Sequence, residues 1–303
     1  MSDARRVLIV SRARAEDGVQ LTGAACLQLI EHGLTPVLTS DEVGENGHVY
    51  GVAEERFEVL GRDCTVAELE IVIVLGGDGS ILKAAEVVRE ANTPLLGINL
   101  GHVGFLAEGE RHELHDIIAR VAAKNYQVTD RLALDVSVMM AGQSVFSTWA
   151  LNEATVEKSA RERMLEVVIE VEGHPLSSFG CDGVVMATPT GSTAYAFSAG
   201  GPVVWPSVEA LLMVPLSAHA LFSRPLVVNP DSMLAVEVLK RSAGAGVLWC
   251  DGRRTFELAP GARVEVRRSA QPVRIVRLSD SPFTNRLVNK FALPVAGWRG
   301  PEA

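Results

Sequence analysis

Residues 69–90, LEIVIVLGGDGSILKAAEVVRE, form the stretch on which the fold depends. Residues 71–75 are an unbroken apolar run of the kind that fills a strand buried on both faces of a parallel sheet. Three glycines within four residues follow at once, and the apolar spacing then becomes helical. Such a turn lets a ligand approach the backbone, and the first turn of the helix offers unpaired N–H groups to an anion. The stretch therefore predicts a phosphate-binding turn.

Asp78 lies inside this turn, between Gly77 and Gly79. A carboxylate beside bound phosphate is repelled unless it binds a metal ion or accepts a proton, so its presence points to chemistry at this position. The alternative is a simple strand-to-helix turn in which Asp78 caps a helix that begins near Ser80.

The composition limits the class of protein. With 303 residues the chain can form one large domain or two smaller ones, and we prefer two. The net charge is -9 and no basic block occurs, so nucleic acid is not an expected partner. No apolar run reaches the ~18 residues of a membrane helix and the N-terminus lacks a signal-peptide core, so we expect a cytoplasmic protein that does not contact a membrane. The widely separated cysteines predict buried thiols in a reducing compartment; they are Cys26, Cys64, Cys181 and Cys250.

Strands and helices alternate through the first part of the chain, which favours an open α/β domain with a mostly parallel sheet over residues 1–130. Strands are expected at residues 6–11, 35–39, 71–75 and 95–98, helices at 15–32, from 80 to Pro94 and at 112–123, and a polar loop at 40–56. A second glycine-rich loop, with Gly97, Gly101 and Gly104, should lie beside the first. A tail within residues 283–303, helical at 284–292, is expected to pack back on this domain. His112 and His115 have no third metal ligand nearby and read as a solvated helix face.

The pattern changes after Asp130, where a β-rich domain is expected over residues 131–282. Its strands are predicted at residues 132–140, 145–151, 165–171, 184–187, 225–228, 234–239, 247–250, 263–266 and 273–278.

Two groups of polar residues stand out in this second domain. Residues 188–195, TPTGSTAY, place four hydroxyl side chains within six residues, next to Tyr195. This surface suits a nucleoside, although a Ser/Thr-rich turn that caps a short helix would have the same composition. Asn152 and Glu153 place an amide and a carboxylate at the end of the apolar run 149–151.

Taken together, these segments closely resemble the NAD kinase family. The matching segments are GGDGS at 76–80, LNE at 151–153, DG at 182–183 and ATPTGSTAY at 187–195, and the resemblance extends over roughly residues 6–286. TPTGSTAY is highly specific, whereas GGDG is shared with diacylglycerol and sphingosine kinases and with phosphofructokinases. The resemblance implies transfer of the γ-phosphoryl group of ATP, or of polyphosphate, to the 2′-hydroxyl of the adenosine ribose of NAD, with a divalent metal such as Mg²⁺. It also implies a homodimer or homotetramer.

The resemblance assigns roles residue by residue. It makes Asp78 the base that accepts the hydroxyl proton, Asn152 and Glu153 contacts to adenine and ribose, and Asp182 a contact to the nicotinamide amide. The other residues that it implies are Gly76, Gly77 and Gly79 in the phosphate loop, Lys83 and Arg163 as phosphate partners, and Thr193, Ala194, Tyr195, Ser198, Ala218 and Asp251 in the dinucleotide pocket.

Some features depart from the family or stay open. Arg253 replaces the glutamine of the family's late Asp-Gly-Gln, and its charge favours phosphate. His219, beside Ala218, is either pocket-lining or a core histidine. Neither G-x-G-x-x-G nor G-x-x-x-x-G-K-[ST] is present, so NAD is not held in the Rossmann manner. Two other functions compete: a lipid or sugar kinase that shares the glycine turn, and a dinucleotide sensor without catalysis.

Overall fold

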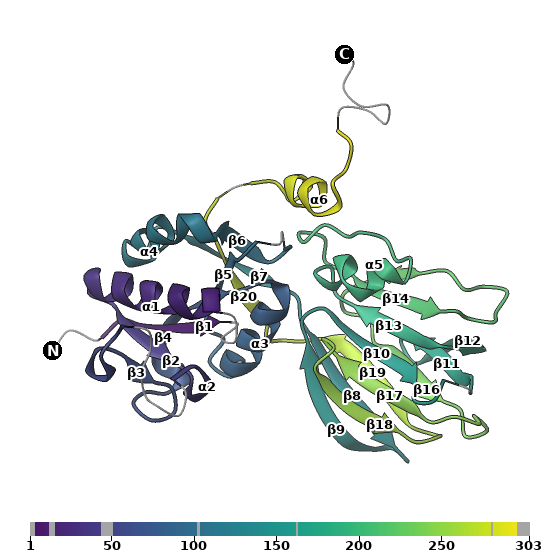
Figure 1. The fold of residues 1–303 in the computed structure, drawn as a ribbon. Helices are drawn as coiled ribbons and strands as arrows, with labels where there is room; N and C mark the ends of the chain where they lie inside the picture. The colour runs from purple at the N-terminus through teal and green to yellow at the C-terminus, as the bar shows by residue number, and fades with distance from the viewer. Residues whose placement is uncertain are drawn as a thin grey trace. The chain divides into compact units, whose positions relative to one another are not determined.

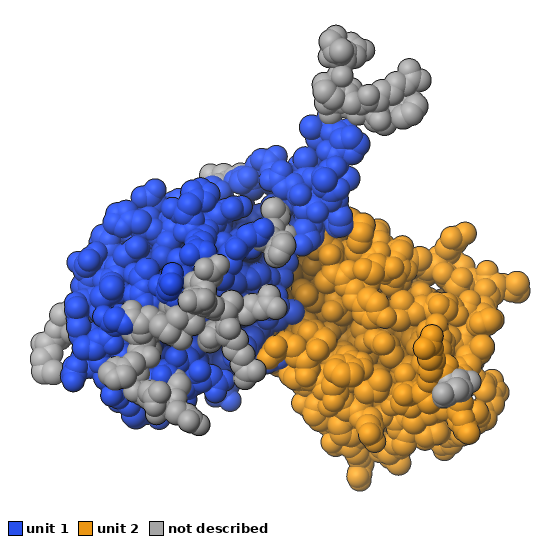
Figure 2. Space-filling model, in the orientation of Figure 1, with its two compact units in different colours: residues 1–130, 273–303 blue, residues 131–272 orange. Residues whose placement is uncertain are grey.

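The computed structural model describes residues 4–11, 16–43, 51–101, 104–161, 163–279 and 281–295. The chain divides into two compact units (Figure 2): unit 1 comprises residues 1–130 and 273–303, and unit 2 comprises residues 131–272. Unit 2 is thus inserted in the chain between two strands of unit 1, β7 (Gln127–Arg131) and β20 (Val273–Arg277).

Unit 1 contains one sheet with the strand order β3-β2-β1-β4-β5-β20-β7, and β6 pairs with β5. The pairings β1–β2, β1–β4, β4–β5 and β5–β20 are parallel, which confirms the expected α/β fold with a mostly parallel sheet. The bounds are β1 Arg6–Ser11, β2 Thr35–Leu38, β3 Glu58–Val59, β4 Leu69–Leu75, β5 Leu95–Asn99 and β6 Ala107–Glu110. Residues 71–75 of β4 are fully buried, as the apolar run predicts.

The strand order of unit 1 gives its sheet a topological switch point. The chain leaves β1 through α1 to β2 on one side, and leaves β4 through α3 to β5 on the other, so the strand order reverses between β1 and β4. At such a point the carboxyl ends of the strands leave a crevice where ligands bind in open α/β sheets. In Figure 1, α1 and α4 lie side by side over the sheet. The bounds are α1 Glu16–Glu31, α2 Ser40–Val43, α3 Asp78–Val88, α4 Leu114–Ala122 and α6 Phe283–Phe291, with single turns η1 Glu54–Arg56, η2 Val66–Glu68 and η3 Arg111–Glu113.

The segment expected to be a loop at residues 40–56 begins instead with α2. Glu42 of this helix is buried, and its carboxylate accepts hydrogen bonds from the backbone N–H groups of Ser11 (2.6 Å) and Thr39 (3.2 Å). Burial raises the pKa of Glu42. Residues 44–50 of this segment lie outside the described residues.

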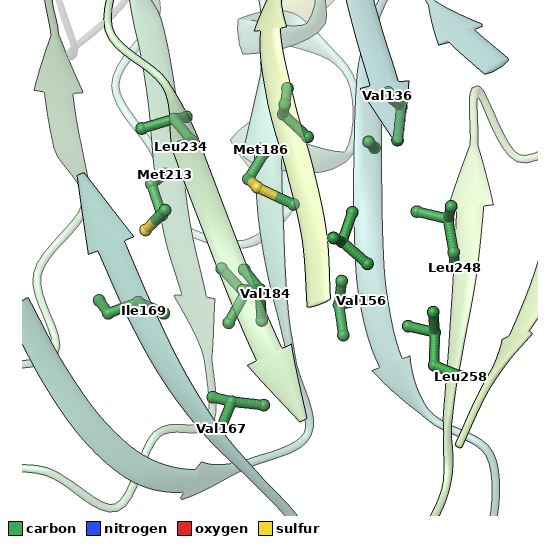
Figure 3. Packing of buried hydrophobic residues seen from close by; sticks show 14 of the residues in the cluster. Val136, Val156, Val167, Ile169, Val184, Met186, Met213, Leu234, Leu248 and Leu258 are labelled. Carbon is green, nitrogen blue, oxygen red and sulfur yellow. The ribbon is translucent and has the colours of Figure 1, made fainter. Parts of the chain in front are cut away.

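Unit 2 consists of two six-stranded sheets, ordered β15-β14-β13-β10-β17-β18 and β12-β11-β16-β19-β8-β9. Both sheets contribute side chains to one apolar core (Figure 3), in which Val156, Met186 and Leu248 of the first sheet pack with Val136 and Leu234 of the second. The bounds are β8 Leu134–Met140, β9 Gln143–Ala150, β10 Glu153–Lys158, β11 Leu165–Val171, β12 His174–Cys181, β13 Gly183–Ala187, β14 Leu211–Leu216, β15 Leu226–Val228, β16 Leu234–Val238, β17 Gly246–Cys250, β18 Arg254–Leu258 and β19 Arg263–Arg268.

A smaller core lies on the other face of β13 and β14. Val185 and Leu212 point to this face because side chains alternate along a strand, and they pack with Ala196 and Val204. Ala196 belongs to α5 (Tyr195–Ser198), which follows the single turn η4 (Gly191–Thr193). The TPTGSTAY run is therefore anchored on the sheet by apolar residues that follow it in the chain, Ala196 and Val204.

The structure corrects several strand assignments. A strand at residues 273–278 was expected in the second domain, but β20 (Val273–Arg277) pairs with β5 in the sheet of unit 1 through Ile275 and Leu95. The strands β10, β12, β14 and β18 were not predicted, since their polar and apolar residues are mixed or carry Pro and Gly. The prediction of buried thiols is confirmed, because all four cysteines are free and buried. Within the described part of the chain no helix is long and apolar enough to cross a membrane.

Candidate active site

The glycine turn joins β4 to α3 in unit 1. The N–H of Gly76 donates to the carbonyl of Ile98 (2.9 Å), and a Cβ at Gly76 would lie 2.4 Å from Ser80 Oγ, so only glycine fits there. Gly77 is the N-cap of α3 and makes no side-chain cap. Apart from its chain neighbours and the backbone of α3, no described heavy atom lies within 4 Å of a Cβ built at Gly77 or Gly79. The turn is thus closed toward the sheet and open on its outer side, where phosphate could approach.

Asp78 connects the two glycine loops. Its Oδ2 accepts the N–H of Phe105 and its Oδ1 accepts the N–H of Leu106, each at 3.0 Å. Gly104 permits this contact, because a Cβ there would lie 2.5 Å from Asp78 Oδ1. The alternative in which Asp78 caps its helix is not what the structure shows: α3 begins at Asp78 itself, and the carboxylate binds the neighbouring loop. Asp78 is half-buried at the carboxyl edge of the sheet.

Lys83 does not lie in the glycine turn. It stands five residues into α3, about one and a half helical turns from Asp78, and it is exposed. Its Nζ lies 3.8 Å from Asp41 Oδ2, a weak surface ion pair that a phosphate could displace.

In unit 2, Asn152, Glu153 and the TPTGSTAY run form one cluster. Glu153 is 7% exposed, and its carboxylate accepts the backbone N–H of Tyr195. Burial, followed by the charge of Asp251, raises the pKa of Glu153 from 4.5 to about 8. Its Oε2 is buried and has no hydrogen-bond partner among the described residues. A buried polar atom without a partner costs free energy, so a polar group of a ligand would stabilise this site.

Asp251 is directed into the protein rather than outward. Its carboxylate accepts the N–H groups of Leu151 (2.9 Å), Asn152 (2.7 Å) and Glu153 (3.3 Å). Arg254 Nη2 donates to it at 2.7 Å. Burial raises the pKa of Asp251. These contacts suit a residue that positions Asn152 and Glu153, and the backbone of Asp251 itself is left-handed (φ 54°).

Two hydroxyl groups of the TPTGSTAY run make hydrogen bonds inside the protein and stabilise the turn. Thr188 Oγ1 donates to the carbonyl of Leu151 (2.6 Å), and Ser192 Oγ donates to that of Pro189 (2.6 Å) and accepts the N–H of Val204 (2.9 Å). Thr188 and Ser192 are fully buried, so the expectation of four outward hydroxyls is wrong for these two. The more accessible positions of the run and of α5 include all four residues that the resemblance implies; they are Thr190, Thr193, Ala194, Tyr195, Phe197 and Ser198.

A second cluster in unit 2 surrounds Asp182. Lys158 Nζ lies 2.5 Å from Asp182 Oδ1, and this contact lowers the pKa of Asp182. This cluster forms part of a pocket with a volume of about 260 Å³. The residues that line it are Lys158, Arg161, Arg163, Met164, Cys181, Asp182, Ser217 and His219. Cationic side chains outnumber Asp182 here, so the pocket suits an anion. Ala218 packs against the core, and His219 is exposed, which rules out the alternative of a core histidine.

The two clusters lie at opposite ends of one strand pair. Glu153 opposes Ala187 at one end of β10 and β13, and Glu157 opposes Gly183 at the other. Glu153 and Lys158 are five residues apart, which is about 16 Å along a strand. A ligand that reaches both ends would have to be extended.

Sequence reasoning missed several residues of these sites. The N–H groups of Phe105 and Leu106 carry no side-chain signal at all. Lys158 and Arg161 carry no motif, and the strand β10, which ends at Lys158 and leads into the turn with Arg161, was itself not predicted. Arg254, whose guanidinium stacks 4.4 Å above the ring of Trp149, follows the Asp251 segment and could have been suspected from it.

Comparisons with known proteins match both parts of the chain. Residues 7–126 match the family model of the ATP-NAD kinase N-terminal domain, and residues 151–278 match that of the ATP-NAD kinase C-terminal domain. The chain is 59% identical to an NAD kinase of Leifsonia xyli subsp. xyli, over 100% of this chain and 99% of the relative. It is 63% identical to an NAD kinase of Thermobifida fusca, over 99% and 93%. No match supports a lipid or sugar kinase among these findings.

Solved structures show the same fold. The yeast NADH kinase complexed with NADH superposes with a TM-score of 0.83 at 22% identity, covering 98% of this chain and 90% of that one. An NAD kinase from Archaeoglobus fulgidus in complex with ATP gives a TM-score of 0.68 at 23% identity, covering 95% and 98%. Together with the full-length relatives, these matches confirm the resemblance seen in the motifs: the chain belongs to the NAD kinase family.

Proposed function

We propose that this chain is an NAD kinase that transfers the γ-phosphoryl group of ATP to the 2′-hydroxyl of the adenosine ribose of NAD. The observation that carries the proposal is identity near 60% to NAD kinases over essentially the whole chain. The NADH complex of the yeast relative and the ATP complex of the Archaeoglobus fulgidus relative support both ligands.

Asp78 is the proposed general base. The ribose 2′-oxygen attacks the γ-phosphorus, the bond to the leaving ADP oxygen breaks, and the hydroxyl proton passes to an Asp78 oxygen and then to solvent. The two N–H donors that hold Asp78 fix its orientation, and the open sides of Gly77 and Gly79 leave room for phosphate oxygens. Positioning and charge neutralisation supply most of the catalysis in phosphoryl transfer.

A divalent metal such as Mg²⁺ is proposed to arrive with ATP. In the described part of the chain no group of three His, Cys, Asp or Glu residues could hold a metal ion. Mg²⁺ is commonly held by substrate phosphates and waters with one or two carboxylates, so the phosphates of ATP at the open glycine loop would supply its ligands and leave Asp78 to accept the proton. When bound, the metal neutralises charge on the phosphate oxygens.

The clusters of unit 2 are proposed to bind NAD. Asn152 and Glu153, with Thr193, Ala194, Tyr195 and Ser198, would contact the adenosine half. Asp182, with the Ala218 segment, would contact the nicotinamide amide, and Arg163 would contact phosphate. The spacing along β10 supports these roles, because NAD has two nucleosides separated by a pyrophosphate.

We further propose a cytoplasmic homodimer or homotetramer. Exposed large apolar side chains on unit 2, such as Leu221, Phe222 and Trp249, support self-association. Light scattering should give a multiple of 32.4 kDa, and a monomer at working concentration would contradict the proposal.

The activity is tested by incubating the protein with NAD, Mg²⁺ and either ATP or polyphosphate, and by detecting NADP with an NADP-specific dehydrogenase. NADH, a sugar and a diacylglycerol serve as competing acceptors. We expect NADP formation with NAD. Phosphorylation of the sugar or the lipid alone would overturn the proposal, and NAD binding without NADP formation from either donor would favour a sensor.

A further inference from the structure

The C-terminal helix α6 packs on the loop that holds Asp78. The ring of Phe105 lies 5.8 Å from that of Phe283 and 5.9 Å from that of Phe291, at the two ends of α6. Phe105 is buried, and its N–H is one of the two donors to Asp78. The aromatic contacts therefore hold Phe105, whose backbone N–H binds Asp78, the proposed base.

Arg286, in the middle of α6, holds the same loop by its carbonyl groups. Its Nη1 donates to the carbonyl oxygens of Phe105 and Ala107, each at 2.8 Å, and its Nη2 pairs with Glu108. The side chain is 14% exposed, so these bonds are largely shielded from water. Phe105 is thus held on both sides: its N–H by Asp78 and its C=O by Arg286.

We propose that Arg286 is a positioning residue that fixes the segment 105–107 and, through the N–H groups of Phe105 and Leu106, the orientation of the Asp78 carboxylate. The proposal rests on the proposed function of Asp78 as the base. A guanidinium is suited to the role because its planar fork binds the two carbonyls through one nitrogen and the carboxylate through another, whereas an ammonium donates from a single nitrogen.

Arg277 provides a matched control, because it shares the partner Glu108 with Arg286. The Glu108 carboxylate is 1% exposed and pairs with Arg277 as well as with Arg286, and it accepts the N–H of Leu278 (3.2 Å). Arg277 otherwise donates to the carbonyls of Ser279 and Ser281, so none of its hydrogen bonds reaches residues 105–107. Replacing Arg277 removes a partner of Glu108, as replacing Arg286 does, but leaves the carbonyls of Phe105 and Ala107 bound.

The experiment compares Arg286→Met, Arg286→Lys and Arg277→Met in the full-length protein. Arg286→Met should lower kcat by about 10- to 100-fold, the range expected when a catalytic group is misplaced by about 1 Å, with KM for NAD and ATP nearly unchanged. Arg286→Lys should recover part of kcat, since it keeps the charge and one donor direction. Arg277→Met should keep kcat within about twofold while lowering the melting temperature.

Hydrogen exchange supplies a readout besides activity. The amides of Phe105 and Leu106 should exchange faster in Arg286→Met and at the wild-type rate in Arg277→Met, each measured well below the melting temperature of the variant. The amides of Ile71 and Ile73 in the buried strand β4 serve as an internal standard.

Three results would overturn the proposal: unchanged exchange at residues 105–106 in Arg286→Met, wild-type kcat in Arg286→Met, or equal kcat losses in Arg286→Met and Arg277→Met that follow stability. Asp78→Asn, assayed alongside, distinguishes a failure of the positioning role of Arg286 from a failure of the proposed function. If Asp78→Asn stays active, the base assignment fails. If Asp78→Asn is inactive while Arg286→Met is fully active, only the positioning role fails.

Discussion

Asp78 is the residue on which the chemistry depends, and its replacement by asparagine tests the base directly. The amide cannot accept the ribose proton, so kcat should fall by about 10²–10⁴-fold, the usual contribution of general-base catalysis. KM for NAD should change little or fall, because a negative charge leaves the phosphate site. Steady-state kinetics at saturating ATP and Mg²⁺ measures both values. A variant with more than about a tenth of the wild-type kcat would refute the role.

The structure adds a control to this test. Asn keeps one acceptor oxygen but turns an NH₂ group toward a backbone N–H, so one of the two bonds to Phe105 and Leu106 is lost. A lost hydrogen bond costs about 1 kcal/mol, which leaves the protein folded. A melting curve close to that of wild type would show that the fall in kcat is not a fall in folded protein.

Glu153 predicts a pH effect on stability. Its pKa is about 8 in the folded protein against an ordinary value of 4.5. Between these pH values the folded state keeps a proton that the unfolded state has lost, so this group's contribution to stability falls as pH rises from about 4.5 to about 8. Glu153→Gln cannot ionise and removes this dependence. Its melting temperature relative to wild type should therefore rise steadily over that range.

The same substitution tests how Glu153 contacts NAD. A protonated carboxyl and an amide are both neutral and both donate and accept, so Glu153→Gln should bind NAD with near wild-type affinity at pH 7, whereas Glu153→Ala should bind it more weakly. Calorimetric titration with NAD measures this. Strong loss of affinity in the glutamine variant would mean that an ionised carboxylate is required.

Residues were predictable from sequence where their chemistry is unusual for their surroundings. Asp78 stands out as an acid among glycines, and Asn152 and Glu153 end an apolar run. The family resemblance named Asp251, but only the structure shows its carboxylate turned toward three backbone N–H groups. Backbone donors such as the N–H of Tyr195 leave no trace in residue identity, and so no sequence pattern could assign them.

At the scale of elements, the loop from β5 to β6 is as important as the glycine turn itself. Gly104→Ala keeps every catalytic side chain but builds a Cβ 2.5 Å from Asp78 Oδ1, so either the loop or the carboxylate must move. We expect kcat to fall by about 10-fold or more with little change in KM for ATP. Gly77→Ala is the matched control for folding, since its Cβ meets no described atom within 4 Å.

The outcome for Gly104→Ala is read from initial rates and from the melting temperature together. Wild-type kcat would mean that the loop can shift without displacing Asp78, which would separate the two glycine loops functionally. A lower kcat at an unchanged melting temperature would show that the position of the β5–β6 loop affects catalysis through Asp78.

Elements were predictable where one rule dominates. The unbroken apolar run 71–75 predicts a buried strand, and within the turn Gly76 is the position where a Cβ would meet Ser80. The strand β10 was missed because its residues, EATVEK, alternate weakly, although it is central in its sheet and carries Glu153 and Lys158 at its two ends. The start of α3 was placed two residues too late, because Gly77 replaces the polar cap that would have marked it.

At the scale of the whole molecule, unit 2 is an insertion whose two ends meet. The N–H of Ser269 donates to the carbonyl of Ala133 (2.8 Å), and Leu134 opposes Arg268 in the pairing of β8 with β19. The chain therefore enters and leaves unit 2 at neighbouring positions. Sequence patterns could not show this, because β20 returns to the parallel sheet with the same alternation as the antiparallel strands before it.

This arrangement predicts that residues 131–272 fold alone. Its core is built only from its own two sheets, and its ends already lie side by side, so excision breaks no strand pairing within it. The isolated fragment should show β-type circular dichroism and one cooperative thermal transition. It should bind NAD more weakly than the full chain and form no NADP, because Asp78 is absent. A fragment that binds a hydrophobic dye and melts without cooperativity would mean instead that unit 2 depends on unit 1 for its packing.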